Sequence, residues 1–232
     1  MIDYGQFCTV ARGSEIFGER WTPLVVREIL CGSRRFNDIR RGVPRMSATL
    51  LAQRLRKLEE VGIIEKRRCG TVWEYGPTQA GEELRPIVIA LGHWGARWIG
   101  SRLEREKLDA GFLMWDIRRF AQRDEFPPGR CTVIHFRFRD ARQGEKQWWL
   151  VVDKGEADLC RDDPGHEVSV VVDATVRALT EIWTGDSDPS TQLRAGTLRV
   201  HGGGREGRDL WRWLGRSAFA PTRIAARDTA GA

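Results

Sequence analysis

The side chains of this 232-residue sequence that are best suited to chemistry are cationic, and they concentrate between Arg34 and Arg68. That segment holds eleven Lys and Arg residues against four Asp and Glu residues. It therefore carries the whole net charge of +6, and the chain has a pI of about 9.4. Clustered Lys and Arg side chains bind phosphate groups, so the segment indicates a nucleic-acid partner. A merely solvated charged face is the alternative.

One helix inside this segment is predicted to have an apolar face and a polar face. Ser47 can cap its first turn, because a serine hydroxyl accepts a hydrogen bond from a free N–H there, and Gly62 can end it. Apolar residues recur at intervals of four and three, the period of an amphipathic helix, at Leu51, Leu55, Leu58 and Val61. The opposite face is predicted to carry Thr49, Gln53, Arg54, Arg56 and Lys57.

The neighbouring elements give this helix a place in a known order. A helix that starts at Thr22-Pro23 and stops at Gly32 comes before it, followed by a short basic helix over residues 34–42. Residues 63–68 and 72–75 then form two predicted strands joined by a turn. Helix, turn, helix and hairpin is the order of a winged helix-turn-helix, whose second helix enters the major groove while the hairpin lies along the phosphate backbone.

This geometry predicts two kinds of contact with DNA. Side chains with a hydroxyl or with two suitably spaced polar groups can read base edges, and the candidates are Ser47, Thr49, Gln53 and Arg54. Cations that hold phosphates add affinity with little sequence information, and the candidates are Arg45, Lys57, Lys66, Arg67 and Arg68.

A longer helical region over residues 79–107 follows the hairpin. Its broad apolar face consists of Ile87, Leu91, Trp94, Trp98 and Ile99. Such a face needs a partner, and a helix at the end of a small DNA-binding domain commonly packs against its copy in a second subunit. We therefore expect a homodimer, with burial inside the monomer as the alternative.

The character of the sequence changes near residue 106, so we expect two domains, over residues 1–105 and 106–232. In the second, residues 131–140, 146–155, 167–174 and 196–202 alternate as strands do, and a helix follows the third of them. The N-terminal domain is thus predicted to be mainly helical, and the C-terminal domain to be an α+β unit with an antiparallel sheet.

The first hundred residues resemble the HxlR family of bacterial transcriptional regulators, winged helices related to the MarR group. The resemblance lies in Cys8, GERWTPLVVREIL, the RRFNDIRR helix, LAQRLRKLEEVGII and the EYGPTQAG that closes the wing. It implies DNA binding and transcription regulation. The wing departs from the family, because its tip is the short CGT and Pro77 stands where leucine is usual, so we expect firmer contact from the helix than from the wing.

The second domain resembles the sterol carrier protein fold in its order of elements, in VVVDATVRALTEIWTG and in AGTLRVHGG. The resemblance implies a cavity for a hydrophobic small molecule. The sequence offers seven aromatic residues as its lining: Phe136, Phe138, Trp148, Trp149, Trp183, Trp211 and Trp213. Their alternative role is ordinary core packing.

Cys8 is the thiol to single out, because some relatives in the resembled family sense oxidants or electrophiles through a cysteine at that place. Its alternative role is that of a small buried apolar residue. The five cysteines are scattered without C-x-x-C spacing, the four histidines lack metal-ligand spacing, and no catalytic set is evident. We expect no metal, no cofactor and no enzymatic activity, and the lack of a membrane span or secretory signal predicts a cytoplasmic protein.

The sequence therefore predicts a homodimeric DNA-binding transcriptional regulator whose C-terminal domain senses a hydrophobic effector. A first alternative makes Cys8 the switch and leaves the second domain as a dimerising or interaction module. A second alternative is a lipid-binding carrier or accessory protein without specific DNA binding.

Overall fold

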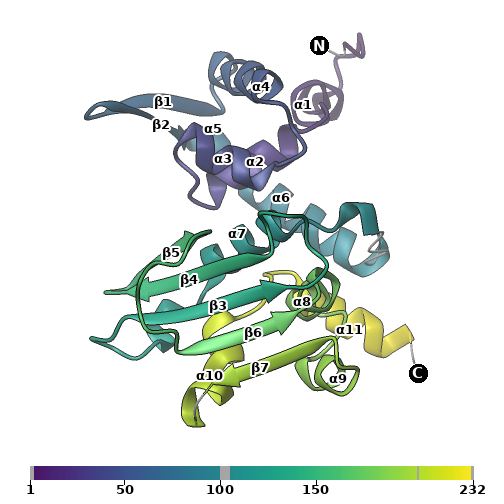
Figure 1. The fold of residues 1–232 in the computed structure, drawn as a ribbon. Coiled ribbons are helices and arrows are strands. Elements are labelled where there is room, and N and C mark those ends of the chain that lie inside the picture. The colour runs from purple at the N-terminus through teal and green to yellow at the C-terminus, as the bar shows by residue number, and fades with distance from the viewer. Residues whose placement is uncertain (1–2, 100–104, 203, 231–232) are drawn as a thin grey trace. The chain divides into compact units, whose positions relative to one another are not determined.

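The computed structural model describes residues 3–99, 105–202 and 204–230. The chain forms two compact units, Met1–Gly92 and His93–Ala232 (Figure 1). The expected boundary near residue 105 lies beside the undescribed residues 100–104 and stays a prediction. No described helix is long and apolar enough to cross a membrane.

The first unit has the predicted order of elements. Its helices are α1 (Thr9–Phe17), α2 (Thr22–Leu30), α3 (Phe36–Gly42) and α4 (Ala48–Glu60), followed by strands β1 (Ile64–Cys69) and β2 (Val72–Pro77) and by α5 (Gln79–Glu82). α6 (Arg85–Trp94) continues from the first unit into the second. The core unites the apolar faces of α2, α3, α4 and β1, with Val25, Ile29, Ile39, Leu51, Leu55 and Ile64 almost fully buried.

Local sequence signals explain the ends of α4. The Ser47 hydroxyl accepts a hydrogen bond from the Leu50 N–H at 3.2 Å, as an N-cap should. Gly62 follows the helix with φ of +73°, a left-handed conformation that costs glycine little, and the Ile63 N–H donates back to the Leu58 carbonyl at 2.9 Å. α2 begins at Thr22 as predicted, but Thr22 does not act as its N-cap, the role that its hydroxyl suggested, because it is already helical and Trp21 is the N-cap.

The second unit begins with a π-helical turn, η1 (Gly95–Ile99), and a 3₁₀ turn, η2 (Arg105–Lys107). The helices α7 (Ala110–Phe120), α8 (Val176–Thr184), α9 (Pro189–Arg194), α10 (Gly204–Leu214) and α11 (Ala220–Ala230) follow, with a 3₁₀ turn, η3 (Arg123–Glu125), after α7. Its strands are β3 (Thr132–Phe138), β4 (Gln147–Asp153), β5 (Glu156–Cys160), β6 (Val170–Ala174) and β7 (Leu198–Gly202).

These strands form one sheet in the order β5-β4-β3-β6-β7 within the described residues. β3 and β6 run parallel and the other neighbours run antiparallel, so the sheet is mixed and the predicted antiparallel sheet is wrong. The prediction missed β5, a short and largely polar edge strand. Because the chain leaves the meander at β5 and crosses back to β3, β6 enters in the same direction as β3.

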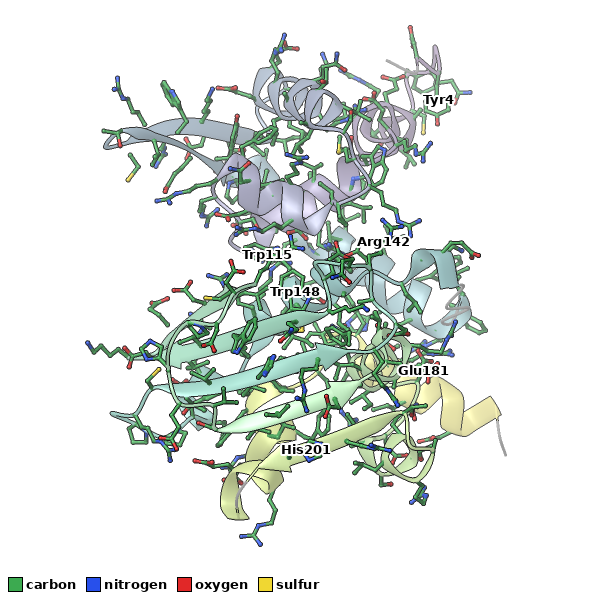
Figure 2. The ribbon with its side chains drawn as sticks, viewed as in Figure 1. Tyr4, Trp115, Arg142, Trp148, Glu181 and His201 are labelled. Atoms are coloured by element: carbon green, nitrogen blue, oxygen red, sulfur yellow. The ribbon has the colours of Figure 1, made fainter. Side chains whose placement is uncertain are left out.

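The sheet has one apolar face, covered by α7, α8 and α10 (Figure 1). Residues Ile134 and Phe136 of β3 and Trp148 and Leu150 of β4 alternate onto this face, as the period of two requires (Figure 2 labels Trp148). The opposite face is more polar. There Arg137 pairs with Asp173 through two contacts of 2.6 Å, and His201, also labelled in Figure 2, lies 3.1 Å from Asp173.

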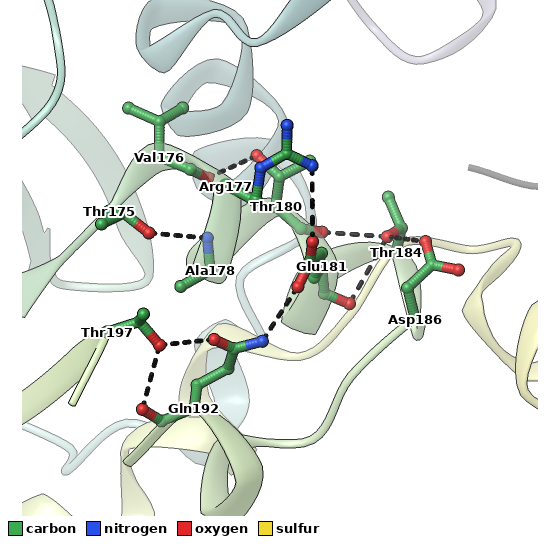
Figure 3. Close-up of polar contacts among 10 residues, drawn as sticks. All are labelled: Thr175, Val176, Arg177, Ala178, Thr180, Glu181, Thr184, Asp186, Gln192 and Thr197. Carbon is green, nitrogen blue, oxygen red and sulfur yellow. Dashed lines mark hydrogen bonds and ion pairs between the residues drawn. The ribbon is translucent and has the colours of Figure 1, made fainter. Parts of the chain in front are cut away.

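The buried amide of Gln192 connects α9 to α8 and to Thr197, the residue just before β7 (Figure 3). Gln192 is only 8% exposed, and its Nε2 donates to Glu181 at 2.9 Å while its Oε1 accepts from the Thr197 hydroxyl at 2.6 Å. Thr175 caps α8 by accepting from the Ala178 N–H at 3.0 Å. A buried polar group is tolerated when its hydrogen bonds are made, so this network fixes how α9 packs against the sheet edge.

Candidate nucleic-acid interface

The exposed face of α4 carries polar residues at helical spacing. Thr49, Gln53 and Arg56 are exposed at intervals of four and three residues, so they lie on one face, and Ser47 is exposed at the N-cap. The leucines of the same helix are buried in the core. The arrangement presents hydroxyl, amide and guanidinium groups outward from a rigidly anchored helix.

Arg54 is not on this face. It is 8% exposed, and its guanidinium forms an ion pair with Glu19, which follows α1. The sequence held the signal for this placement, since Arg54 comes three residues after Leu51 and four before Leu58 and so falls within their apolar arc. The exposed arginine of α4 is instead Arg56, which was not among the predicted base contacts.

The predicted phosphate contacts lie at three places. Arg45 is exposed just before the α4 cap, and Lys57 is partly buried with its amine 3.4 Å from Glu60. Lys66, Arg67 and Arg68 are exposed on β1. The structure thus puts these cations beside α4 and along the hairpin, which we call the wing.

A buried carboxylate that sequence reasoning missed positions α3 against α2. Glu28 is fully buried, lies 2.6 Å from Arg27 and accepts a hydrogen bond from the Ser33 hydroxyl at 3.3 Å. A Cβ atom on Gly42 would lie within 2.4 Å of that carboxylate, so a larger residue at position 42 would force the buried carboxylate or α3 to move. The available signal was an acidic residue three positions after Val25 in an otherwise apolar stripe.

The apolar residues of α6 and η1 remain largely exposed in the single chain. Ile87, Leu91, Trp94 and Ile99 are each at least half exposed, and Trp98 is 69% exposed. Within the second unit η1 packs against α11, and His93 Nδ1 lies 2.7 Å from the Thr222 hydroxyl oxygen. A continuous α-helix was expected here, and the structure instead has a π-helical turn at Gly95–Ile99.

The predicted pocket residues divide between the two faces of the sheet. Phe136, Phe138, Trp148, Trp183 and Trp213 belong to the core cluster, and Trp211 packs against it. Trp149 lies on the other face and stacks on His135, with ring centroids 4.3 Å apart. Burial, the largest effect, lowers the pKa of His135. Trp213 is 1% exposed, and its indole N–H has no hydrogen-bond partner among the described residues.

The five cysteines form no disulfide with one another, and Cys8 is exposed at the N-cap of α1. Among the residues that the structure describes, no group of three or more His, Cys, Asp or Glu side chains could hold a metal ion.

The first unit therefore defines a winged helix-turn-helix protein. Residues 16–103 match the family model described as HxlR-like helix-turn-helix. The HTH-type transcriptional regulator YvaP of Bacillus subtilis (strain 168) is 33% identical over 88 residues, which cover 37% of this chain and 82% of YvaP. Rv3095 of Mycobacterium tuberculosis (strain H37Rv), also an HTH-type transcriptional regulator, is 38% identical over 96 residues, which cover 39% of this chain and 59% of Rv3095.

Among solved structures, the redox regulator HypR in its oxidized form is 31% identical over 38% of this chain and 94% of HypR, with a TM-score of 0.36. The extent of the match to YvaP, together with the match to the family model, establishes the family of this chain. The chain belongs, through its first hundred or so residues, to the HxlR-like family of helix-turn-helix transcriptional regulators. The family model leaves the sheet of the second unit outside its match.

Proposed function

We propose that this HxlR-type regulator reads double-stranded DNA as a homodimer, with α4 as the reading helix, and that its second unit binds a hydrophobic effector. The observation that carries the proposal is the outward polar face of α4 beside the basic wing in the same unit. An α-helix fits the major groove, and that groove distinguishes all four base pairs.

The exposed side chains of α4 suit base edges in different ways. Gln53 can form two hydrogen bonds with adenine, and Arg56 can form two with guanine. The hydroxyls of Ser47 and Thr49 can serve a base or a phosphate. Arg54 has a supporting role in this proposal, because its ion pair with Glu19 holds α4 against the segment after α1. Arg45 and Lys57 would hold phosphates on either side of the reading face.

Selection of binding sites from a random pool of duplexes, followed by affinity measurements on the selected site, tests this proposal. We expect Arg56→Ala to cost about 1–3 kcal/mol on the selected site and to relax the preference at one base pair. Arg199→Ala, the same charge change at an exposed position of β7, is the control and should leave affinity unchanged. A wild-type protein with equal, weak affinity for every sequence would instead favour a carrier or accessory protein without specific DNA binding.

The homodimer rests on the exposed apolar face of α6 and η1. Exposed apolar patches of this kind mark interaction surfaces in folded proteins. A two-fold dimer would place two reading helices about 34–36 Å apart, one turn of DNA. Sedimentation velocity should show a dimer that Trp98→Ser shifts toward monomer, and a monomeric wild type at micromolar concentration would rule the homodimer out.

The effector site rests on the aromatic residues of the second unit and on the buried indole of Trp213. A donor left without a partner in an apolar interior costs free energy, and an oxygen acceptor on a bound ligand would supply that partner. We therefore propose a mainly apolar ligand with one neutral acceptor. Native mass spectrometry of protein purified from its own host should show a co-purified small molecule, and Trp213→Phe should lose it.

Cys8 supports a second candidate function, a switch driven by thiol oxidation or alkylation. The thiol is exposed at the start of α1, and the ion pair between Glu19 and Arg54 connects the segment after α1 to the reading helix. A mild electrophile should then abolish DNA binding by the native protein but not by Cys8→Ser. Equal sensitivity of both proteins would dismiss this candidate.

A further inference from the structure

The wing has two faces of different chemistry. Directly paired residues on neighbouring strands share a face of a sheet, and Lys66 pairs with Tyr75 while Arg68 pairs with Trp73. We call this side the cationic face. The intervening residues Glu65, Arg67 and Glu74 lie on the other side, the ion-paired face. Three consecutive basic residues are therefore not equivalent, because only two of them point the same way.

The two faces also differ in free charge. On the ion-paired face, Arg67 lies 2.6 Å from Glu65, and Glu74 lies 3.4 Å from Arg35. On the cationic face, Lys66 Nζ lies 4.8 Å from the centre of the Trp73 ring. Neither Lys66 nor Arg68 pairs with a carboxylate in the described part of the chain. The cationic face therefore has positive charge available for an anion. On the ion-paired face, the positive charges are already neutralised by carboxylates.

Contacts within the first unit show which helix each face accompanies. Tyr75 of the cationic face packs against the core cluster that contains Leu55 and Leu58 of α4, and Glu59 of the same helix adds to burial in raising the tyrosine pKa. Glu74 of the ion-paired face is instead tied to Arg35, the N-cap of α3. The cationic face is therefore on the side of the reading helix.

Trp73 is the unusual member of the cationic face, because its large apolar side chain is 53% exposed. An indole between two cations offers a flat surface on which a sugar or base can pack, while the cations hold the phosphates beside it. Double-stranded DNA, already required by the proposed reading helix, matches this combination of charge and shape.

We propose that the wing contacts the duplex through its cationic face alone: Lys66 and Arg68 bind phosphates, Trp73 packs against the deoxyribose backbone between them, and Arg67 makes no contact with DNA. This inference rests on the proposed function. It adds Trp73 to the interface and removes Arg67, which sequence order alone had grouped with its two neighbours.

Fluorescence anisotropy with a labelled 30-base-pair duplex of mixed sequence, measured over a salt series, tests the assignment. Phosphate contacts do not depend on sequence, so no operator is needed. Lys66→Ala and Arg68→Ala should each weaken binding and reduce the salt slope by about 1. Arg67→Ala, the same change at the intervening position, should leave affinity and slope as in the wild type.

Trp73→Ala should weaken binding about fivefold or more without changing the salt slope, because packing releases no counterions. Trp73→Phe should recover part of the loss, and unchanged circular dichroism would show that both variants are folded.

The possible failures are distinguishable. A wild type that binds no duplex would overturn the proposed function itself. Binding with an Arg67→Ala effect equal to that of its neighbours would overturn the face assignment alone. A Trp73→Ala variant that binds normally but changes the oligomeric state would overturn the DNA contact and assign the indole to an interface between copies.

Discussion

The two units of this chain differ in the kinds of side chain that they bury. The first unit buries charged groups. Glu28 of α2 is buried against α3, and Arg54 of α4 is buried and paired with Glu19. The second unit buries an aromatic core around Phe136 and Trp213 behind a mixed sheet. Both units bury an apolar core, but among the described residues only the first unit also buries charged groups, which fix helix positions through specific contacts. The buried polar residues of the second unit, such as Gln192, are uncharged.

The largest effect is expected in the aromatic core. Phe136 is fully buried on β3, and Phe136→Ala should destabilise the second unit by about 3–5 kcal/mol through lost burial and a cavity. Urea unfolding followed by circular dichroism measures this. Trp73→Ala, which truncates an exposed aromatic residue, is the control and should change the unfolding free energy by less than about 0.5 kcal/mol. Equal costs would mean that burial does not distinguish these positions.

Gly42→Ala probes the polar packing of the first unit. Its new methyl group would overlap the buried Glu28 carboxylate, so we expect a loss of about 1–3 kcal/mol in the unfolding free energy. Gly13→Ala is the matched control inside α1, where a Cβ atom meets nothing within 4 Å and helix propensity favours alanine. A harmless Gly42→Ala would show that α3 can move away from α2 at little cost.

Arg54→Ala and Arg56→Ala separate support of the reading helix from contact with DNA. We expect Arg54→Ala to lower the unfolding free energy by about 1–2 kcal/mol, below the cost of breaking a fully buried pair, because Glu19 keeps access to water. Arg56→Ala should leave the melting temperature unchanged. Thermal melts of both variants measure these losses in stability. A larger loss for Arg56→Ala than for Arg54→Ala would contradict the buried position of Arg54.

The smallest effect is a pH dependence on the polar face of the sheet. The hydrogen bonds from Arg137, helped by His201, hold the pKa of Asp173 below its ordinary value. A carboxyl with a lowered folded pKa stabilises the fold above its unfolded pKa, and this contribution disappears as the pH falls through the folded pKa. Asp173→Asn should therefore cost less than about 1 kcal/mol at pH 7, because Arg137 is half exposed, and nothing in strong acid.

Urea unfolding of the Asp173→Asn variant at a series of pH values measures this difference. In an Arg137→Gln background most of the pH dependence should vanish. If it persists there unchanged, Arg137 is not its source.

Local patterns in the sequence were enough to predict the individual helices and strands of the first unit and their order. The leucine period, the Ser47 cap and Gly62 define α4, and alternation with a glycine turn defines the wing, because these signals act over a few residues. The family resemblance of the first hundred residues followed from the same elements and is shown by the comparisons. Four of the seven candidate pocket residues lie on strands, and there the period of two already separates Trp149 from its core-facing neighbour Trp148.

Contacts between groups that are far apart in the sequence depend on how the complete chain folds. Glu19 forms an ion pair with Arg54, and the Glu28 carboxylate lies against Gly42. β6 pairs in parallel with β3 after the chain has passed through β5. Each of these pairings joins residues that no short-range period connects, so their partners depend on how whole elements pack. The physical reason is that a helix or strand forms from local backbone preferences, while its neighbours are chosen by the burial and polar contacts of the complete fold.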